Sequence, residues 1–143
     1  MKKLIIIIIS LLSFSANAQK YTNTYINDAT KVALNWIKDV NSKEFNNAFN
    51  LLSKEVKERY QKETWIALMS DLMLEFGEIQ DRTIIKKEFQ SELEGLEDGF
   101  YVFIEYQSVY KNTTDHIEYI LLKQNDKLQW QILDYNYEFK NKE

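Results

Sequence analysis

The spacing of hydrophobic positions changes once along the chain, near Gly77. Between Tyr25 and Phe76 apolar residues recur every three or four positions, which is the spacing of one buried helix face. After Gly77 the spacing moves toward two, as in half-buried strands. Helices followed by hairpin-linked strands are typical of α+β folds. The pattern therefore predicts N-terminal helices packed on the concave side of a curved antiparallel sheet of about four strands.

The first half divides into a long helix up to Asn41, a short second helix, a segment opening at Ser53 and a further helix before Gly77. Ser42 and Ser53 are candidate N-caps, because a serine hydroxyl can accept a hydrogen bond from a free backbone N–H. Gly77 stands where a helix end often needs a positive φ. The positions expected to face the core are Ile26, Ala29, Ala33, Trp36, Ile37, Val40, Phe45, Ala48, Phe49, Leu52, Val56, Tyr60, Trp65, Leu68, Met69, Leu72, Met73 and Phe76.

Four strands are expected in the second half, over residues 79–89, 100–110, 116–123 and 128–137. In the second strand Val102, Ile104 and Tyr106 share one face. In the last strand the apolar parity switches between Ile132 and Leu133. Such a switch predicts a β-bulge, which would also bend the sheet.

The N-terminus has the order of a secretory signal peptide. Lys2 and Lys3 precede an apolar run from Leu4 to Leu12, and Ala16-Asn17-Ala18 is a small-x-small cleavage site. The run is shorter than the roughly 20 residues of a spanning helix. We predict cleavage after Ala18, a periplasmic or secreted protein without membrane attachment, and a single domain over residues 19–143. The alternative is an uncleaved anchor at the inner membrane.

The net charge restricts the kinds of partner that we expect, and the absence of cysteine restricts how the domain can be stabilised or attached. The net charge is −4, and removal of Lys2 and Lys3 with the signal peptide makes it −6. Such a surface repels phosphate backbones, so nucleic acid is not an expected partner. The chain has no cysteine, which leaves packing alone to hold an exported domain together. It also lacks the acylation site of a bacterial lipoprotein.

One set of residues, spread over most of the chain, is informative through its order and spacing. It consists of Trp36-Ile37, Phe45, Phe49, Ser53, Trp65, Phe76-Gly77, Arg82, Asp98-Gly99-Phe100-Tyr101-Val102, Tyr106-Gln107-Ser108, Glu118, Trp130-Gln131-Ile132 and Tyr135. This order and spacing resemble the DUF4019 family, small exported bacterial domains of unknown function. The resemblance covers roughly residues 29–137 and implies an NTF2-like or cystatin-like fold, but the family brings no catalytic residues.

Carboxylates in apolar segments are the candidates for catalysis. Glu105 and Glu118 lie on strands expected to pair, and two neighbouring carboxylates can share a proton as an acid/base pair. Asp39 is a further candidate. The favoured interpretation is that these acidic residues are solvent-exposed or form ion pairs with Arg82 or a lysine. His116, the single histidine, is expected to be an exposed strand residue. No metal site or cofactor is predicted.

The favoured function is non-catalytic binding of a small ligand or a protein partner in the cleft between sheet and helices. Tyr106, Tyr119, Trp130 and Tyr135 are the candidate wall of that cleft, because aromatic side chains with polar tips line binding sites. The alternative is a small hydrolase or isomerase that uses the carboxylates above. If one face of the sheet is bare, we expect a homodimer through the sheet.

Overall fold

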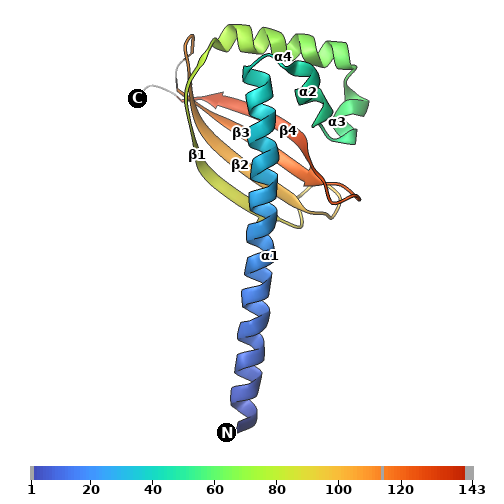
Figure 1. Cartoon of the computed structure of the whole chain (residues 1–143), viewed down its shortest axis with the longest axis vertical. Coiled ribbons are helices and arrows are strands. Elements are labelled where there is room, and N and C mark those ends of the chain that lie inside the picture. The colour runs from blue at the N-terminus through green and yellow to red at the C-terminus, as the bar shows by residue number, and fades with distance from the viewer. Residues whose placement is uncertain (1, 114, 141–143) are drawn as a thin grey trace.

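The computed structural model describes residues 2–113 and 115–140, and for residues 2–17 it describes the backbone alone. Four helices precede four strands, as the change of spacing predicted. The strands form one antiparallel sheet in the order β1-β2-β3-β4, which curves around the upper half of α1 (Figure 1). The elements are α1 (Lys2–Asn41), α2 (Phe45–Asn50), α3 (Lys54–Arg59), α4 (Lys62–Phe76), β1 (Ile79–Gln90), β2 (Tyr101–Tyr110), β3 (His116–Gln124) and β4 (Trp130–Phe139).

Helix α1 has two parts with different surroundings. Its C-terminal part crosses the sheet and buries Ala29, Ala33 and Trp36, whereas its N-terminal part extends away from the domain (Figure 1). The helix runs without a break through Ala18. Met1 and the side chains of residues 2–17 lie outside the described residues, so the signal peptide stays a prediction. Among the described residues, no helix is both long enough and apolar enough to cross a membrane.

The helix ends follow the expected chemistry at two of three positions. The Ser53 hydroxyl accepts a hydrogen bond from the Val56 N–H at 3.4 Å, so it caps α3 as predicted. Gly77 ends α4 with a φ of 79°. The prediction for Ser42 was wrong, because the chain first makes a turn and Glu44 becomes the residue before α2, without a side-chain cap.

Successive residues of the inner strands alternate between a buried face and a more solvent-exposed face. Val102, Ile104 and Tyr106 are fully buried on the face toward the helices. In β4 the register shifts between Ile132 and Asp134, which confirms the predicted bulge. The bulge keeps Ile132 and Tyr135 on the helix side although their positions differ in parity.

His116 is fully buried, so the expectation of an exposed residue was wrong. It begins β3, an inner strand, and stacks on Tyr110 with ring centroids 5.2 Å apart. Phe76, from the end of α4, covers it with a centroid distance of 4.9 Å. Because β3 starts between β2 and β4 and beneath the end of α4, its first residue has no contact with solvent.

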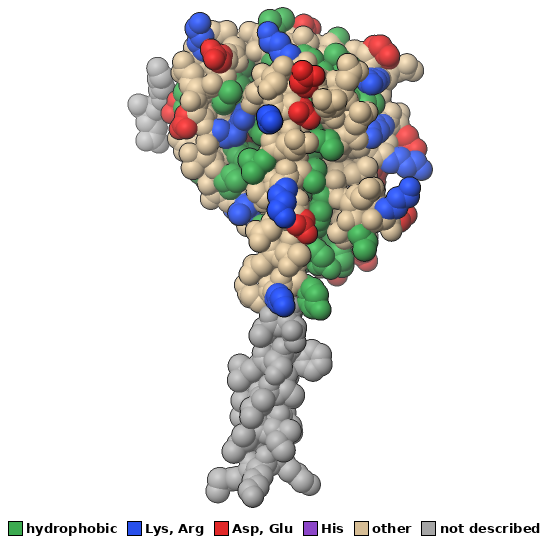
Figure 2. Space-filling model, in the orientation of Figure 1, with side chains coloured by type: hydrophobic (Ala, Val, Ile, Leu, Met, Phe, Trp, Pro, Cys, Tyr) green, Lys and Arg blue, Asp and Glu red, His purple; other side chains and the backbone are tan. Residues whose placement is uncertain are grey.

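The surface over α1 mixes both charges. Figure 2 shows acidic and basic side chains interspersed on this face, with apolar side chains between them.

Candidate functional site: an open cleft beside a buried ion pair

A buried ion pair joins β1 to β3 on the helix side of the sheet. Arg82 Nη2 lies 2.9 Å from Glu118 Oε2, and the side chains are 13% and 1% exposed. Arg82 Nε donates to the same oxygen at 3.0 Å. Arg82 Nη1 donates to Asn41 Oδ1 at 2.7 Å, which ties the C-terminal end of α1 to the sheet. The sequence had offered Glu118 as one partner of Arg82, and this pairing is confirmed.

The Glu118 carboxylate is saturated with donors. The Tyr110 hydroxyl donates to Oε1 at 2.8 Å and the Tyr135 hydroxyl at 2.7 Å, while Ser108 donates to Oε2. Burial acts to raise the pKa of the Glu118 carboxyl, but the charge of Arg82 and these hydrogen bonds outweigh it and hold the pKa below its ordinary value. Glu118 is therefore an ionised, fully bonded structural carboxylate.

The predicted carboxylate pair does not form. Glu105 is paired across the strands with Tyr119, whereas Glu118 is paired with Tyr106. Because alternate residues of a strand point to opposite faces, Glu105 lies on the outer face of the sheet and Glu118 on the helix face. The two carboxylates cannot share a proton, and the acid/base hypothesis for this pair was wrong. Asp39 is half-buried on α1 and does not line the cleft described below.

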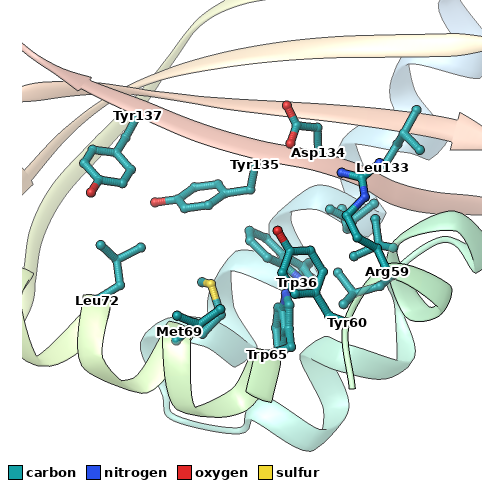
Figure 3. A pocket seen from close by; sticks show the side chains of 14 residues that line it. Trp36, Arg59, Tyr60, Trp65, Met69, Leu72, Leu133, Asp134, Tyr135 and Tyr137 are labelled. Carbon is teal, nitrogen blue, oxygen red and sulfur yellow. The ribbon is translucent and has the colours of Figure 1, made fainter. Parts of the chain in front are cut away.

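A cleft of about 330 Å³ opens between α3, α4 and β4, next to the ion pair. The view in Figure 3 shows aromatic rings from both sides pointing into it, Tyr135 and Tyr137 from the sheet, Trp65 from α4 and Tyr60 from the residue after α3. Tyr135 connects the cleft to the cluster, since its hydroxyl donates to Glu118. The complete lining is Trp36, Leu52, Val56, Arg59, Tyr60, Trp65, Leu68, Met69, Leu72, Ile132, Leu133, Asp134, Tyr135 and Tyr137.

Backbone hydrogen bonds join the helical side of this cleft to its sheet side. The backbone N–H of Ser53 donates to the Ile132 carbonyl at 2.8 Å, and the Ile132 N–H donates to the Leu51 carbonyl at 2.9 Å. These bonds fasten the start of α3 to the edge of β4. The rings of Trp36 and Tyr135, whose centroids are 5.2 Å apart, both line the cleft beside this junction.

Of the four aromatic residues proposed from the sequence, the cleft contains one. Tyr135 lines it, but Tyr106 is fully buried in the core, where burial raises the pKa of its hydroxyl to about 12. Trp130 packs near Tyr25, with ring centroids 6.2 Å apart. Tyr119 stacks on Phe103 at 5.8 Å on the outer face, and its hydroxyl donates to Glu138. The placement of Tyr106, Tyr119 and Trp130 in the cleft wall was wrong, because Tyr119 lies on the outer face of the sheet, whereas Tyr106 and Trp130 are packed in the core and do not line the cleft.

Three polar groups of the cleft went unrecognised in the sequence. Arg59 is exposed at its mouth and forms no ion pair with any described residue. Tyr60 follows it, 36% exposed. Trp36 is 1% exposed, and its indole N–H has no hydrogen-bond partner in the described part of the chain. Its helical spacing marked Trp36 as a core residue, but spacing alone could not show an unpaired donor beside a cleft.

No group of three or more histidine or acidic side chains is placed to hold a metal ion among the described residues. The cleft side chains are largely apolar or aromatic, with one arginine and one aspartate. The Asp134 carboxylate extends to the opposite side of β4 from the Tyr135 ring in Figure 3.

Comparison with known proteins shows which family and which solved structure this chain is similar to. Residues 32–135 match the sequence profile of DUF4019, described as a protein of unknown function. Among solved structures, the chain is similar to a Campylobacter jejuni protein described as an NTF2-like transpeptidase, with a TM-score of 0.50 and 15% identity. The match covers 73% of this chain and 96% of that protein, and it shows an NTF2-like fold. No protein of curated function matches the chain.

Proposed function

The chain belongs to the DUF4019 family and has an NTF2-like fold, and we propose that it is an exported, non-catalytic protein that binds a small, largely apolar ligand. The observation that carries the proposal is the open cleft of about 330 Å³ between α3, α4 and β4. Ligand sites are typically concave, mostly apolar and equipped with a few polar groups, and their volumes begin near 300 Å³. This cleft fits that description at its lower limit, so the ligand is small.

Preorganisation of the cleft supports binding. Tyr135 is held by its bond to Glu118, and Glu118 by Arg82. Trp36 and Trp65 are 1% and 7% exposed, and Tyr135 packs on Trp36. Rings that are already ordered lose little conformational entropy when a ligand arrives, which improves affinity for a given contact area.

The electrostatics favour binding over catalysis. A general acid or base at neutral pH needs a pKa moved toward 7. The pKa of Glu118 moves the other way, below its ordinary value, and each of its oxygens already accepts hydrogen bonds. Glu105 is on the other face of the sheet. The hydrolase or isomerase alternative is thus left without an acid/base pair in the cleft.

Binding can be tested with N-phenyl-1-naphthylamine, a neutral apolar dye that fluoresces when it leaves water. Leu68 lines the cleft and is 54% exposed on α4, so Leu68→Trp should fill part of the cleft. Leu74 is 63% exposed on the same helix and lies outside the cleft, which makes Leu74→Trp the matched control. We expect Leu68→Trp to weaken dye binding about tenfold and Leu74→Trp to leave it unchanged. Equal binding by both variants would contradict the proposal.

Export is a separate part of the proposal with its own test. It rests on the basic start, the apolar run and Ala16-Asn17-Ala18. Mass spectrometry of the protein from an expressing bacterium should find a chain that starts at Gln19. A chain that retains its first 18 residues and stays in the membrane fraction would instead support the uncleaved anchor.

Association through the sheet remains a prediction. The outer face carries the stacked pair Phe103 and Tyr119. Charged residues surround this pair, among them Lys86, whose ammonium lies 5.8 Å from the Phe103 ring, and Glu105. Sedimentation velocity of the purified protein distinguishes a monomer from a dimer.

A further inference from the structure

The cleft combines an apolar floor with hydrogen-bond donors at one end. Arg59 is the last residue of α3, and Tyr60 follows as its C-terminal flanking residue. In Figure 3 the Arg59 guanidinium lies beside β4, at the opposite end of the cleft from Leu72 and Tyr137, and the Tyr60 hydroxyl points toward the interior. An apolar ligand seated among the rings would therefore present one end to these donors.

Arg59 is the available cation of this region. The chain has two arginines, Arg59 and Arg82, and Arg82 is consumed by Glu118. Lys54, on the same helix, faces Glu58 with 3.5 Å between Nζ and Oε1. The guanidinium of Arg59 has no carboxylate within ion-pair distance among the described residues. An arginine fork matches the geometry of a carboxylate, which it can bind with two parallel hydrogen bonds.

The remaining polar groups agree with an anion. The Tyr60 hydroxyl can donate to a carboxylate oxygen, and the unpartnered indole N–H of Trp36 is a donor only. Asp134 is the one carboxylate residue of the lining, and its side chain lies across the strand from the Tyr135 ring (Figure 3), whereas a ligand carboxylate would find Arg59, which has no ion-pair partner among the described residues.

From this complementarity we infer that the ligand of the cleft is an apolar monocarboxylate, with its hydrocarbon part among the aromatic rings and its carboxylate on Arg59. The inference rests on the proposed ligand-binding function, and it adds the chemical class and the residue that selects it. Aliphatic and aromatic acids share this chemistry, and the choice between them depends on how each fills the cleft.

The test compares probes that differ at one end only. 3-Phenylpropionate, 3-phenylpropan-1-ol and 3-phenylpropylamine carry the same body with a negative, neutral or positive end, and octanoate with octan-1-ol forms an aliphatic series. Titrations at pH 7.5 can be followed by tryptophan fluorescence, since Trp36 and Trp65 line the cleft. We expect each carboxylate to bind about tenfold more tightly than its alcohol, and the amine to bind most weakly.

Variants then assign the preference to one side chain. Arg59→Gln should abolish the advantage of the carboxylate and leave the affinity for the alcohol unchanged, while Arg59→Lys should restore part of the advantage. Lys54→Gln removes a cation from the same helix outside the cleft and should change neither affinity. Alcohol and carboxylate bound equally by the wild type, or a preference that survives Arg59→Gln, would overturn the inference while the apolar site stood. Failure of every probe to bind would overturn both proposals.

Discussion

The ion pair between β1 and β3 makes a demanding prediction for Glu118→Gln. The carboxylate accepts five hydrogen bonds, two from Arg82 at 3.0 and 2.9 Å, one each from Tyr110 and Tyr135 at 2.8 and 2.7 Å, and one from Ser108. A glutamine amide can turn its NH₂ toward the tyrosine hydroxyls, which can also accept. Its oxygen then faces Arg82 without a charge. The main cost is that the Arg82 side chain, which is 13% exposed, loses the negative charge that balances its guanidinium.

Removal of one partner from a buried pair costs about 3–5 kcal/mol because the other charge stays buried. We expect the lower end, about 3 kcal/mol, since Arg82 keeps its bond to Asn41 and slight contact with solvent. The assay is equilibrium urea unfolding with comparison of the midpoints, provided that the slope is unchanged. Glu105→Gln is the matched control, because Glu105 lies on the outer face of the same sheet. It should change the free energy of unfolding by less than about 0.5 kcal/mol.

A loss below about 1 kcal/mol for Glu118→Gln, or equal losses for both variants, would refute the assignment of Glu118 as a buried structural charge. If Glu118→Gln does not fold, Ser108→Ala provides a milder test. It removes one bond to the carboxylate and should cost about 1.5–3 kcal/mol. The double variant Arg82→Met/Glu118→Leu should be less destabilised than Arg82→Met alone or Glu118→Leu alone, because the double variant leaves no charge unpaired.

Three further predictions concern the pH dependence of stability, the ion pair of Lys123 with Glu55, and Gly77 at the end of α4. Because the folded-state pKa of Glu118 lies below its ordinary 4.5, its contribution to stability is complete above the unfolded value and is lost as pH falls through the folded one. The difference between wild type and Glu118→Gln in urea unfolding should therefore shrink below about pH 4.5, and a constant difference would contradict this. The hydrogen bond from Lys123 lowers the pKa of Glu55 to about 2, so Lys123→Met should return that pKa toward 4.5 in an NMR titration; a pKa still near 2 would exclude Lys123 as the cause. Gly77→Ala should cost about 2 kcal/mol in thermal unfolding, because a Cβ would lie 2.7 Å from Asn112 Nδ2 at a φ of +79°; an unchanged melting temperature would refute this.

The sequence by itself determined the architecture. The change from helical to strand spacing at Gly77 predicted helices followed by an antiparallel sheet, and the parity switch in the last strand predicted the bulge at Leu133. These features follow from short-range periodicity, because each residue within a helix or strand must face either the core or the solvent. The cap at Ser53 is local in the same sense. The family followed from residues spread along the whole domain.

Tertiary structure decided which polar side chains meet. Arg82 and Glu118 are 36 positions apart, and only the strand register and the choice of face bring them together while separating Glu118 from Glu105. His116 looked exposed after a polar turn, but Phe76 from a distant helix covers it. Arg59 and Trp36 come from different helices, and both reach one cleft next to the backbone bonds that join the start of α3 to β4 at Ile132. Periodicity fixes the face of each element, whereas a binding site depends on the distances between elements, which are set by packing.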